Sequence, residues 1–255
     1  MTSLLPRRQQ YKKAITLMSH GYSNPQAWPG GQLTVFPWDS EMDAYLLDAS
    51  KQDSGATVLF DLLAKCANLN GGSVDDFVAD EVNAVLLVSR ALAADNVIRY
   101  QSRCPACGTK RQEKILVPDE LEKISEKTDN YPGYDEIVLP LCKDIVHITP
   151  LLVRQERLLA NRTAEDKMKI NDVEIRHLLH IVSINSTKPD TAEELAVWYR
   201  ALHPIDLRHL TDNEKELTPH LNTLLPHKCE NPSCRMDFFH MLTFDQDFFR
   251  PTKPT

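Results

Sequence analysis

The hydrophobic residues of the chain recur at helical spacing most clearly between residues 74 and 94. Apolar side chains there follow a period of about 3.6 residues while polar side chains fall mostly elsewhere, so the segment is predicted to be an amphipathic core helix. A second helical pattern runs from Ser40, a residue suited to an N-cap, to about residue 68. Gly71 and Gly72 then break the chain.

Alternation of apolar and polar residues marks shorter segments that are expected to be strands. Residues 32–36 alternate in this way and end at Pro37. Residues 96–102 alternate just before a closely spaced cysteine pair, and residues 113–117 alternate after it. These two segments are predicted to pair as a hairpin that has the cysteines at its tip.

The second half of the chain mixes both patterns. Residues 123–134 are polar and are predicted to be an exposed connection. Thr191 and Glu194 have the spacing of a capping box, and Pro204 is expected to stop that helix and to open the next. Periodicity assigns the remaining segments: strands at 136–141 and 144–148, a charged helix at 151–169, a buried helix at 172–184 and a closing strand from 237.

Four of the six cysteines form two pairs, Cys104 with Cys107 and Cys229 with Cys234. Two cysteines separated by two to four residues on a tight turn can direct both thiolates at one ion, and zinc prefers a tetrahedron of thiolates. Gly108 after the first pair permits a positive φ that turns backbone N–H groups toward the sulfurs. We therefore expect one structural zinc ion (Zn²⁺) on all four cysteines, which would fasten the C-terminal end to the middle of the chain.

Composition and charge indicate the compartment and the class of partner. The chain has 36 acidic and 29 basic side chains and a net charge of −7, which repels a phosphate backbone and disfavours nucleic acid as a partner. No segment approaches the roughly 20 apolar residues of a membrane span, and the basic N-terminus is not followed by the apolar run of an export signal. We expect no membrane partner and a reducing, cytosolic environment, in which cysteines bind metal or stay free.

Other interpretations of the cysteines and histidines stay open. The two pairs could be unrelated thiols, or the first could be a redox-active C-x-x-C motif, although such motifs lie between a strand and a helix. His227 could replace one cysteine as a ligand or lie beside the metal, and His177 with His180, one helical turn apart, could hold a second ion. Cys66 and Cys142 lie in apolar runs and are expected to be buried thiols.

The sequence contains no motif that predicts catalysis. It has no Walker-type loop, Rossmann glycine fingerprint, nucleophile elbow or H-E-x-x-H helix. A zinc ion held by four thiolates also lacks an open coordination position for water or substrate. We therefore expect no enzymatic activity and no catalytic residues.

These patterns together predict an α+β fold that is mainly helical, with short antiparallel strands and a split zinc-ribbon-like four-cysteine site. Changes in composition divide the chain into four regions. Residues 1–40 are expected to be a loop-rich N-terminal arm, 41–120 a helical region with the first zinc knuckle, 121–226 a strand pair with a helical insertion, and 227–255 the second zinc knuckle with a C-terminal strand or tail.

The segment from about residue 30 to residue 120 resembles the T4-type bacteriophage baseplate hub family, which comprises hub subunits and hub assembly proteins of contractile-tailed phages. In that family, a helix that ends near an arginine leads into a strand, a C-P-x-C-G knuckle and a second strand. Of the candidate metal ligands, the resemblance extends to Cys104 and Cys107. The likeness rests on a Pro/Gly-rich arm with a short strand and on two segments, Ala79-Asp-Glu-Val-Asn-Ala-Val-Leu-Leu-Val-Ser-Arg-Ala-Leu92 and Ile98-Arg-Tyr-Gln-Ser-Arg-Cys-Pro-Ala-Cys-Gly108.

This resemblance implies a non-enzymatic structural or assembly protein of the tail baseplate hub. Such a protein would be made in the host cytoplasm and would act through contacts with other phage tail and hub proteins. If it stays in the particle after assembly, it would lie in the tail baseplate of the virion. Five aromatic residues could contact partners or pack in the core: Trp28, Phe36, Trp38, Phe248 and Phe249.

A zinc-ribbon regulator that binds nucleic acid is the main alternative function. Such a regulator needs a basic face, which the acidic balance of the whole chain does not predict. A thiol oxidoreductase with a reactive cysteine of low pKa is a third possibility. The basic residues that gather around the first cysteine pair are Arg99, Arg103, Lys110, Arg111 and Lys114.

Overall fold

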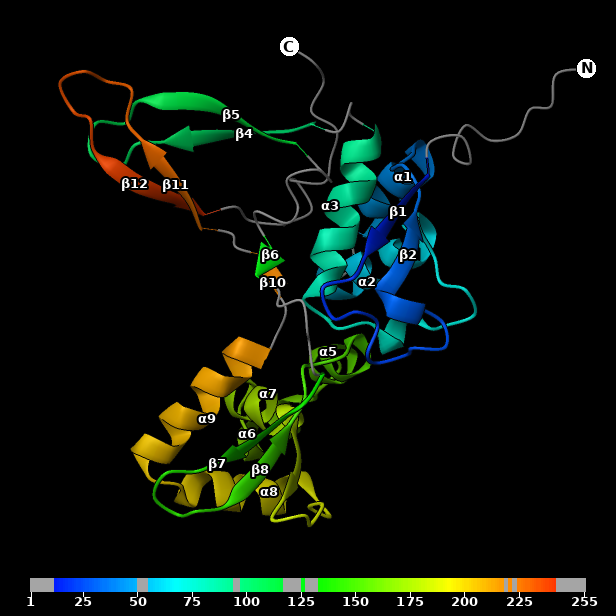
Figure 1. Ribbon diagram of the computed structural model, residues 1–255, viewed down its shortest axis with the longest axis vertical. Coiled ribbons are helices and arrows are strands. Elements are labelled where there is room, and N and C mark those ends of the chain that lie inside the picture. The colour runs from blue at the N-terminus through cyan, green and yellow to red at the C-terminus, as the bar shows by residue number, and fades with distance from the viewer. Residues whose placement is uncertain are drawn as a thin grey trace, which may run out of the picture.

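Helices and short antiparallel sheets share the chain in the computed structural model, which describes residues 12–49, 55–93, 97–116, 125–126, 133–217, 220–221 and 224–241. Figure 1 shows a first helical lobe (residues 12–93), a second helical lobe (residues 133–217) and two hairpins that we call the ribbon (residues 97–116 and 224–241). The α+β class with antiparallel strands that the sequence predicts is confirmed.

The first lobe packs helices against a small antiparallel sheet. Its elements are β1 (Lys13–Thr16), the 3₁₀ helix η2 (Pro29–Gly31), β2 (Gln32–Val35), α1 (Ser40–Ala49), α2 (Gly55–Cys66), β3 (Ala67–Asn68), the 3₁₀ helix η3 (Val74–Asp76) and α3 (Glu81–Ala93). The sheet has the order β1-β2-β3, with Ala14 opposite Thr34 and Thr34 opposite Asn68. Helix α3 contacts both α2 and β2, which explains why most of its side chains are buried.

The segment between β1 and β2 is part of this core. Trp28 is fully buried, and its ring centroid lies 4.3 Å from that of Phe77. Gly21 and Gly31 both have positive φ angles. A Cβ atom on Gly21 would lie 2.4 Å from the Trp28 carbonyl oxygen, and one on Gly31 would lie 2.7 Å from the Cα of His20. These two glycines therefore let the chain fold back on itself and place the indole in the core.

The aromatic residues that were considered as partner contacts mostly belong to the core. Trp28 and Trp38 are buried, and Phe36 is partly buried. The core-packing alternative is therefore the right one for the two tryptophans. Phe248 and Phe249 lie outside the described residues.

A buried carboxylate joins this arm to α3. Glu81, in the first turn of the helix, is 1% exposed, and it accepts hydrogen bonds from the Ser19 amide at 2.6 Å and the Ser19 hydroxyl at 2.7 Å. Burial raises the pKa of Glu81 from 4.5 to about 7, although these hydrogen bonds oppose the shift. The folded protein therefore binds a proton at Glu81 more tightly than the unfolded chain does.

We expect the free energy of unfolding to fall by up to about 3 kcal/mol through Glu81 as the pH rises from about 4.5 to about 7. The sign follows from the raised pKa, because the stabilisation is complete below the unfolded pKa and is lost as pH passes the folded pKa. Urea unfolding of wild type and Glu81→Gln at about pH 5 and about pH 8 measures it. The stability advantage of wild type should be larger at the lower pH, and an advantage that does not change with pH would contradict the assignment.

The second lobe places its helices on one face of a three-stranded sheet. Its elements are β7 (Asp135–Val138), β8 (Ile145–Ile148), α5 (Val153–Ala160), α6 (Ala164–Lys169), α7 (Asp172–His180), β9 (Ile181–Ile184), α8 (Ala192–Ala201) and α9 (Pro204–Leu217). Ile137 and Val146 point into a core with leucines of the helices, whereas Val138 and Ile145 are exposed on the other face. Thr191 caps α8 by accepting the Glu194 amide at 3.0 Å, and Pro204 opens α9, as the sequence predicts. The reciprocal half of the expected capping box is absent, because the Glu194 carboxylate accepts the Asp190 amide at 3.2 Å.

Helix α5 connects the two lobes. The Val153 amide donates to the Phe77 carbonyl at 2.9 Å. The Arg157 guanidinium reaches back to Asp61 at 2.7 Å and to Asp75 at 3.0 Å. Backbone pairing and ion pairs thus hold this helix of the second lobe against the first.

Three predicted helix boundaries are wrong. The helix expected over 74–94 begins at Glu81, after the 3₁₀ helix η3 that Ser73 caps. The helix expected over 151–169 is two helices, because Thr163 caps α6 and so starts a new one. The helix expected over 172–184 ends at His180, and the apolar residues that follow form β9 beside β8. Short apolar runs fit a buried helix or a strand equally well, which explains the last error.

None of the helices in the described ranges is both long and apolar enough to cross a lipid bilayer. Most of the connection expected at 123–134 lies outside the described residues. The exceptions are the short strand β6 (Ser125–Glu126), which pairs with β10 (His220–Leu221), and residues 133–134.

Candidate metal centre

Two antiparallel hairpins build the ribbon and lie side by side at one end of the molecule (Figure 1). The first joins β4 (Val97–Arg103) to β5 (Lys110–Leu116), and the second joins β11 (Leu224–Lys228) to β12 (Asp237–Met241). The final rungs pair Arg103 with Lys110 and Lys228 with Asp237, so each cysteine pair lies in the turn at a hairpin tip. The strand, knuckle and strand predicted around the first pair are confirmed.

The structure brings all four predicted cysteines together. Their sulfur atoms lie within 4.8 Å of one another, with Cys104 3.8 Å from Cys234 and Cys107 3.5 Å from Cys229. These distances exclude disulfides, whose sulfurs are about 2 Å apart. Metal–sulfur bonds of about 2.3 Å in a tetrahedron place the sulfurs about 3.8 Å apart. The four thiols could therefore hold one metal ion between the hairpin tips.

The two turns repeat the same backbone hydrogen bonds. The Cys104 amide donates to the Thr109 carbonyl at 2.9 Å, and the Cys229 amide donates to the Met236 carbonyl at 2.9 Å. The amides of Thr109 and Met236 in turn donate to the sulfur of the second cysteine in each pair. N–H groups aimed at sulfur stabilise the thiolate form that a metal requires.

A residue with positive φ follows the second cysteine of each pair. Gly108 has a φ of 73° and Arg235 a φ of 49°. Glycine adopts this conformation freely, whereas a residue with a Cβ atom adopts it at a cost of roughly 1–2 kcal/mol. The sequence predicts the positive φ angle at Gly108, because glycine favours it, but it gives no such indication at Arg235.

Hydrogen bonding and burial shift the pKa values of the thiols in opposite directions. The hydroxyl and amide of Thr109 lower the pKa of Cys107 to about 6, and burial raises the pKa of Cys229 to about 12. A bound cation would displace the protons and hold the thiols as thiolates. Beside the sulfurs, Arg111 pairs with Glu113 on its own strand at 3.0 Å and joins the hairpins through Glu230 at 3.3 Å.

Aromatic and polar side chains fill the space between the hairpins. Tyr100 stacks on His240 with ring centroids 5.2 Å apart, and its hydroxyl lies 3.2 Å from Nε2 of His227. Nδ1 of His227 lies 3.4 Å from Glu113, and its ring contacts that of Phe238. Both ring nitrogens of His227 therefore have partners, and this histidine lies beside the cysteines without taking the place of one.

The histidine pair on α7 gains no third ligand. Nδ1 of His177 lies 2.6 Å from Glu214, and Nδ1 of His180 lies 2.7 Å from the Thr149 carbonyl oxygen. Within the part of the chain that the structure describes, the four cysteines are the one group of three or more potential ligands whose ligand atoms converge. The contacts of His177 and His180 instead tie α7 to its neighbours.

The remaining cysteines differ from each other. Cys66 is fully buried on α2, as expected. Cys142 is exposed, so the prediction of a buried thiol is wrong. The apolar run around it folds as the turn between β7 and β8, where the amides of Leu141 and Cys142 donate to Asp206 at 2.7 Å and 3.2 Å and the thiol faces outward.

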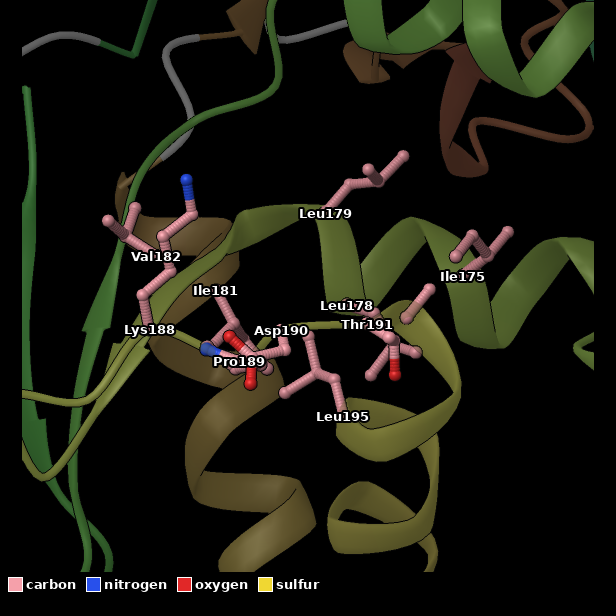
Figure 2. A pocket seen from close by; sticks show the side chains of 11 residues that line it. Ile175, Leu178, Leu179, Ile181, Val182, Lys188, Pro189, Asp190, Thr191 and Leu195 are labelled. Carbon is pink, nitrogen blue, oxygen red and sulfur yellow. The ribbon is translucent and has the colours of Figure 1, made fainter.

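An apolar groove of about 180 Å³ lies where α7, β9 and the start of α8 meet. Figure 2 shows leucine and isoleucine side chains around it, together with Lys188 and Asp190 from the loop before α8. Its lining contains no histidine, no cysteine and no pair of carboxylates. Lys188, Asp190 and Thr191 are its polar lining residues, and this set by itself indicates no particular reaction.

Comparisons with known proteins give no identification. No protein-family model, no curated protein and no solved structure matches the chain. The function must therefore be argued from the residues of this chain and their arrangement.

Proposed function

We propose that the protein is a non-enzymatic structural or assembly protein of a bacteriophage tail baseplate hub, stabilised by a structural zinc ion on Cys104, Cys107, Cys229 and Cys234. The resemblance of residues 30–120 to the hub family supports the biological context. The closed donor set supports the non-enzymatic role, because four thiolates fill a tetrahedral shell.

Zinc is the metal that this donor set favours. Tetrahedral sites of four thiolates bind zinc or iron–sulfur groups. Sulfur separations of 3.5 Å and 3.8 Å suit a single ion with bonds of about 2.3 Å, which is the zinc–thiolate length. The ion would join turns that are far apart in the sequence, so its role would be to fix the two hairpins of the ribbon to each other.

The exposed apolar face of the β11–β12 hairpin is the observation that carries an assembly role. Phe239 is 69% exposed and Met241 is 60% exposed, and Pro226, opposite Phe239, is exposed as well. Aromatic residues and methionine are enriched at the centres of protein interfaces. This face, held rigid by its strand pairing and by the metal, would contact a hub protein.

Photo-crosslinking in cells that assemble the phage tail tests this proposal. A photoreactive phenylalanine analogue in place of Phe239 should form a covalent adduct with a baseplate hub protein, identified by mass spectrometry. The control carries the analogue in place of Arg208, whose side chain is 85% exposed on α9. Absence of hub adducts at position 239, together with normal tail assembly by Phe239→Ser, would refute the proposal.

A further inference from the structure

The outer face of the β4–β5 hairpin carries cationic and amide side chains from its tip as far as the rung of Arg99 and Lys114. Side chains alternate across a strand, so Tyr100, Ser102 and Glu113 face the second hairpin while their neighbours face outward. Nearest the tip, the outward residues form three cross-strand pairs whose six members are all exposed. We call this set the cationic face: Arg99 with Lys114, Gln101 with Gln112, and Arg103 with Lys110.

This arrangement costs stability. Like charges directly opposite each other on neighbouring strands are destabilising, and the cationic face contains two such pairs. None of its four cations forms an ion pair with a carboxylate of the described residues. Arg111, on the same strand but turned toward the second hairpin, has two such partners in Glu113 and Glu230. The outer charges therefore have no carboxylate partner in the part of the chain that the structure describes.

The charge of a metal centre accounts for half of the cationic face at most. A zinc ion with four thiolates has a net charge of −2, and Arg103 and Lys110 flank it directly. Arg99 and Lys114 lie four residues further along their strands, about 14 Å away from that rung. This distance exceeds the Debye length of about 10 Å, so salt largely screens the attraction between Arg99 or Lys114 and the metal centre. Within the described residues, neither a carboxylate nor the metal centre neutralises this outer pair, and an anionic ligand could do so.

The chemistry of the cationic face favours phosphate over a protein surface. Protein interfaces are depleted of lysine and have buried aromatic or apolar anchors. The cationic face has no apolar residue, and Val97, at the far end of the same strand face, is only partly exposed. Arginine, lysine and glutamine side chains are the usual donors to the phosphates of nucleic acids. We infer that the cationic face binds the phosphodiester backbone of nucleic acid, without reading its sequence.

The net charge of −7 does not oppose this inference. Salt screens exposed charges beyond about 10 Å. The electrostatic interaction of a bound strand with the hairpin that it contacts is therefore stronger than its repulsion by the acidic lobes. Backbone contacts of this kind specify position and not sequence. The binding is therefore expected to be weak, strongly dependent on salt and indifferent to base composition.

Fluorescence anisotropy of a labelled single-stranded oligonucleotide with the zinc-loaded full-length protein tests the inference. Four phosphate contacts predict a slope of about −2.8 for log affinity against log salt, which is a loss of about 50-fold between about 50 mM and about 200 mM salt. A variant in which Arg99, Arg103, Lys110 and Lys114 are all glutamine should bind at least about tenfold more weakly at the lower salt and lose this slope.

A matched variant controls for net charge. Glutamine at four cations elsewhere also changes the net charge from −7 to −11, but each of these cations has a carboxylate partner in the second lobe. This control should keep the affinity and the salt slope of wild type, and an equal loss in both variants would overturn the inference. Poly-glutamate that binds as tightly as the oligonucleotide would also overturn it, in favour of an acidic protein partner. The control cations are Lys167, Lys169, Arg208 and Lys215.

Two further measurements keep the test independent of folding and of the proposed function. If the fourfold variant loses its metal, the double variant Arg99→Gln/Lys114→Gln, furthest from the cysteines, should still reduce the slope to about −1.4. Phe239→Ser should bind the oligonucleotide as wild type does, because Phe239 lies on the other hairpin. Failure of hub binding and failure of nucleic-acid binding can therefore be told apart.

Discussion

Serine in place of Cys229 should remove the bound zinc and destabilise the ribbon as severely as serine in place of Cys104. Both changes take one ligand from the same tetrahedron, and the loss of a metal is among the few single-residue effects that exceed about 4 kcal/mol. The ribbon has little else to hold its hairpins together, because their contact consists of aromatic and polar side chains such as Tyr100, His227 and Glu113.

Two measurements on purified protein check this expectation. Elemental analysis should find about one zinc ion per chain in wild type and none in either variant. Hydrogen exchange of the β4–β5 and β11–β12 amides should report the loss of stability in the ribbon, and it separates this loss from any change in the lobes. Iron in place of zinc in wild type would keep the four-cysteine site but correct the identity of the metal.

The shared ion also predicts that the two effects do not add. A Cys104→Ser/Cys229→Ser protein should be no less stable than either single variant, because the first substitution already releases the metal. Cys142→Ser is the control, since this thiol is exposed in the second lobe and should affect neither metal content nor exchange. Unequal and additive effects of Cys104 and Cys229, or a wild-type protein without metal, would argue against the shared site and revive the redox hypothesis.

The candidate metal site could be predicted from the sequence because metal-binding turns are local. A spacer of two residues in the first pair and four in the second, each with a proline, determines the geometry of each half before any tertiary contact forms. The supporting contacts could not be predicted in the same way. The ion pair of Arg111 with Glu230 and the contact of Tyr100 with His227 depend on how the two hairpins pack against each other. The hairpins are far apart in the sequence, so sequence patterns do not predict this packing.

Two helix starts were predicted well from a capping residue and a proline, whereas the cap at Thr163 was missed. Thr191 and Pro204 set the starts of α8 and α9 through local hydrogen bonding and a fixed φ, so the sequence was sufficient. The start of β9 at Ile181 has no such mark. Its place beside β8 is determined by the tertiary structure, where Val146 pairs with Ile184.

Surface function was the hardest part to predict, because it depends on strand register. The basic residues near the first cysteine pair were evident, but the net charge argued against nucleic acid. Pairing Arg99 with Lys114 and turning Glu113 inward separates the cations from the one acid on these strands. A shift of register by one residue would mix them, so the cationic face exists only in the folded hairpin.

Replacing Trp28 with alanine should cost about 3–5 kcal/mol of the free energy of unfolding, the usual range for a large aromatic side chain that is removed from a core. The indole is fully buried and packs on Phe77, which lies just before α3 and also binds α5 through its backbone. The loss should therefore extend beyond the arm to the contact between the lobes. Urea unfolding of the variant at neutral pH measures the change.

Trp28→Phe is the matched control. It keeps an aromatic ring against Phe77 and removes an indole N–H that has no hydrogen-bond partner among the described residues, so its cost should stay below about 2 kcal/mol. A partner-contact role for Trp28 makes the opposite prediction, in which Trp28→Ala keeps its stability and forms fewer hub adducts through position 239. If Trp28→Ala loses stability and Trp28→Phe retains most of it, the loop before β2 is part of the hydrophobic core. The glycines and prolines of this segment then serve to fold the loop around the Trp28 side chain.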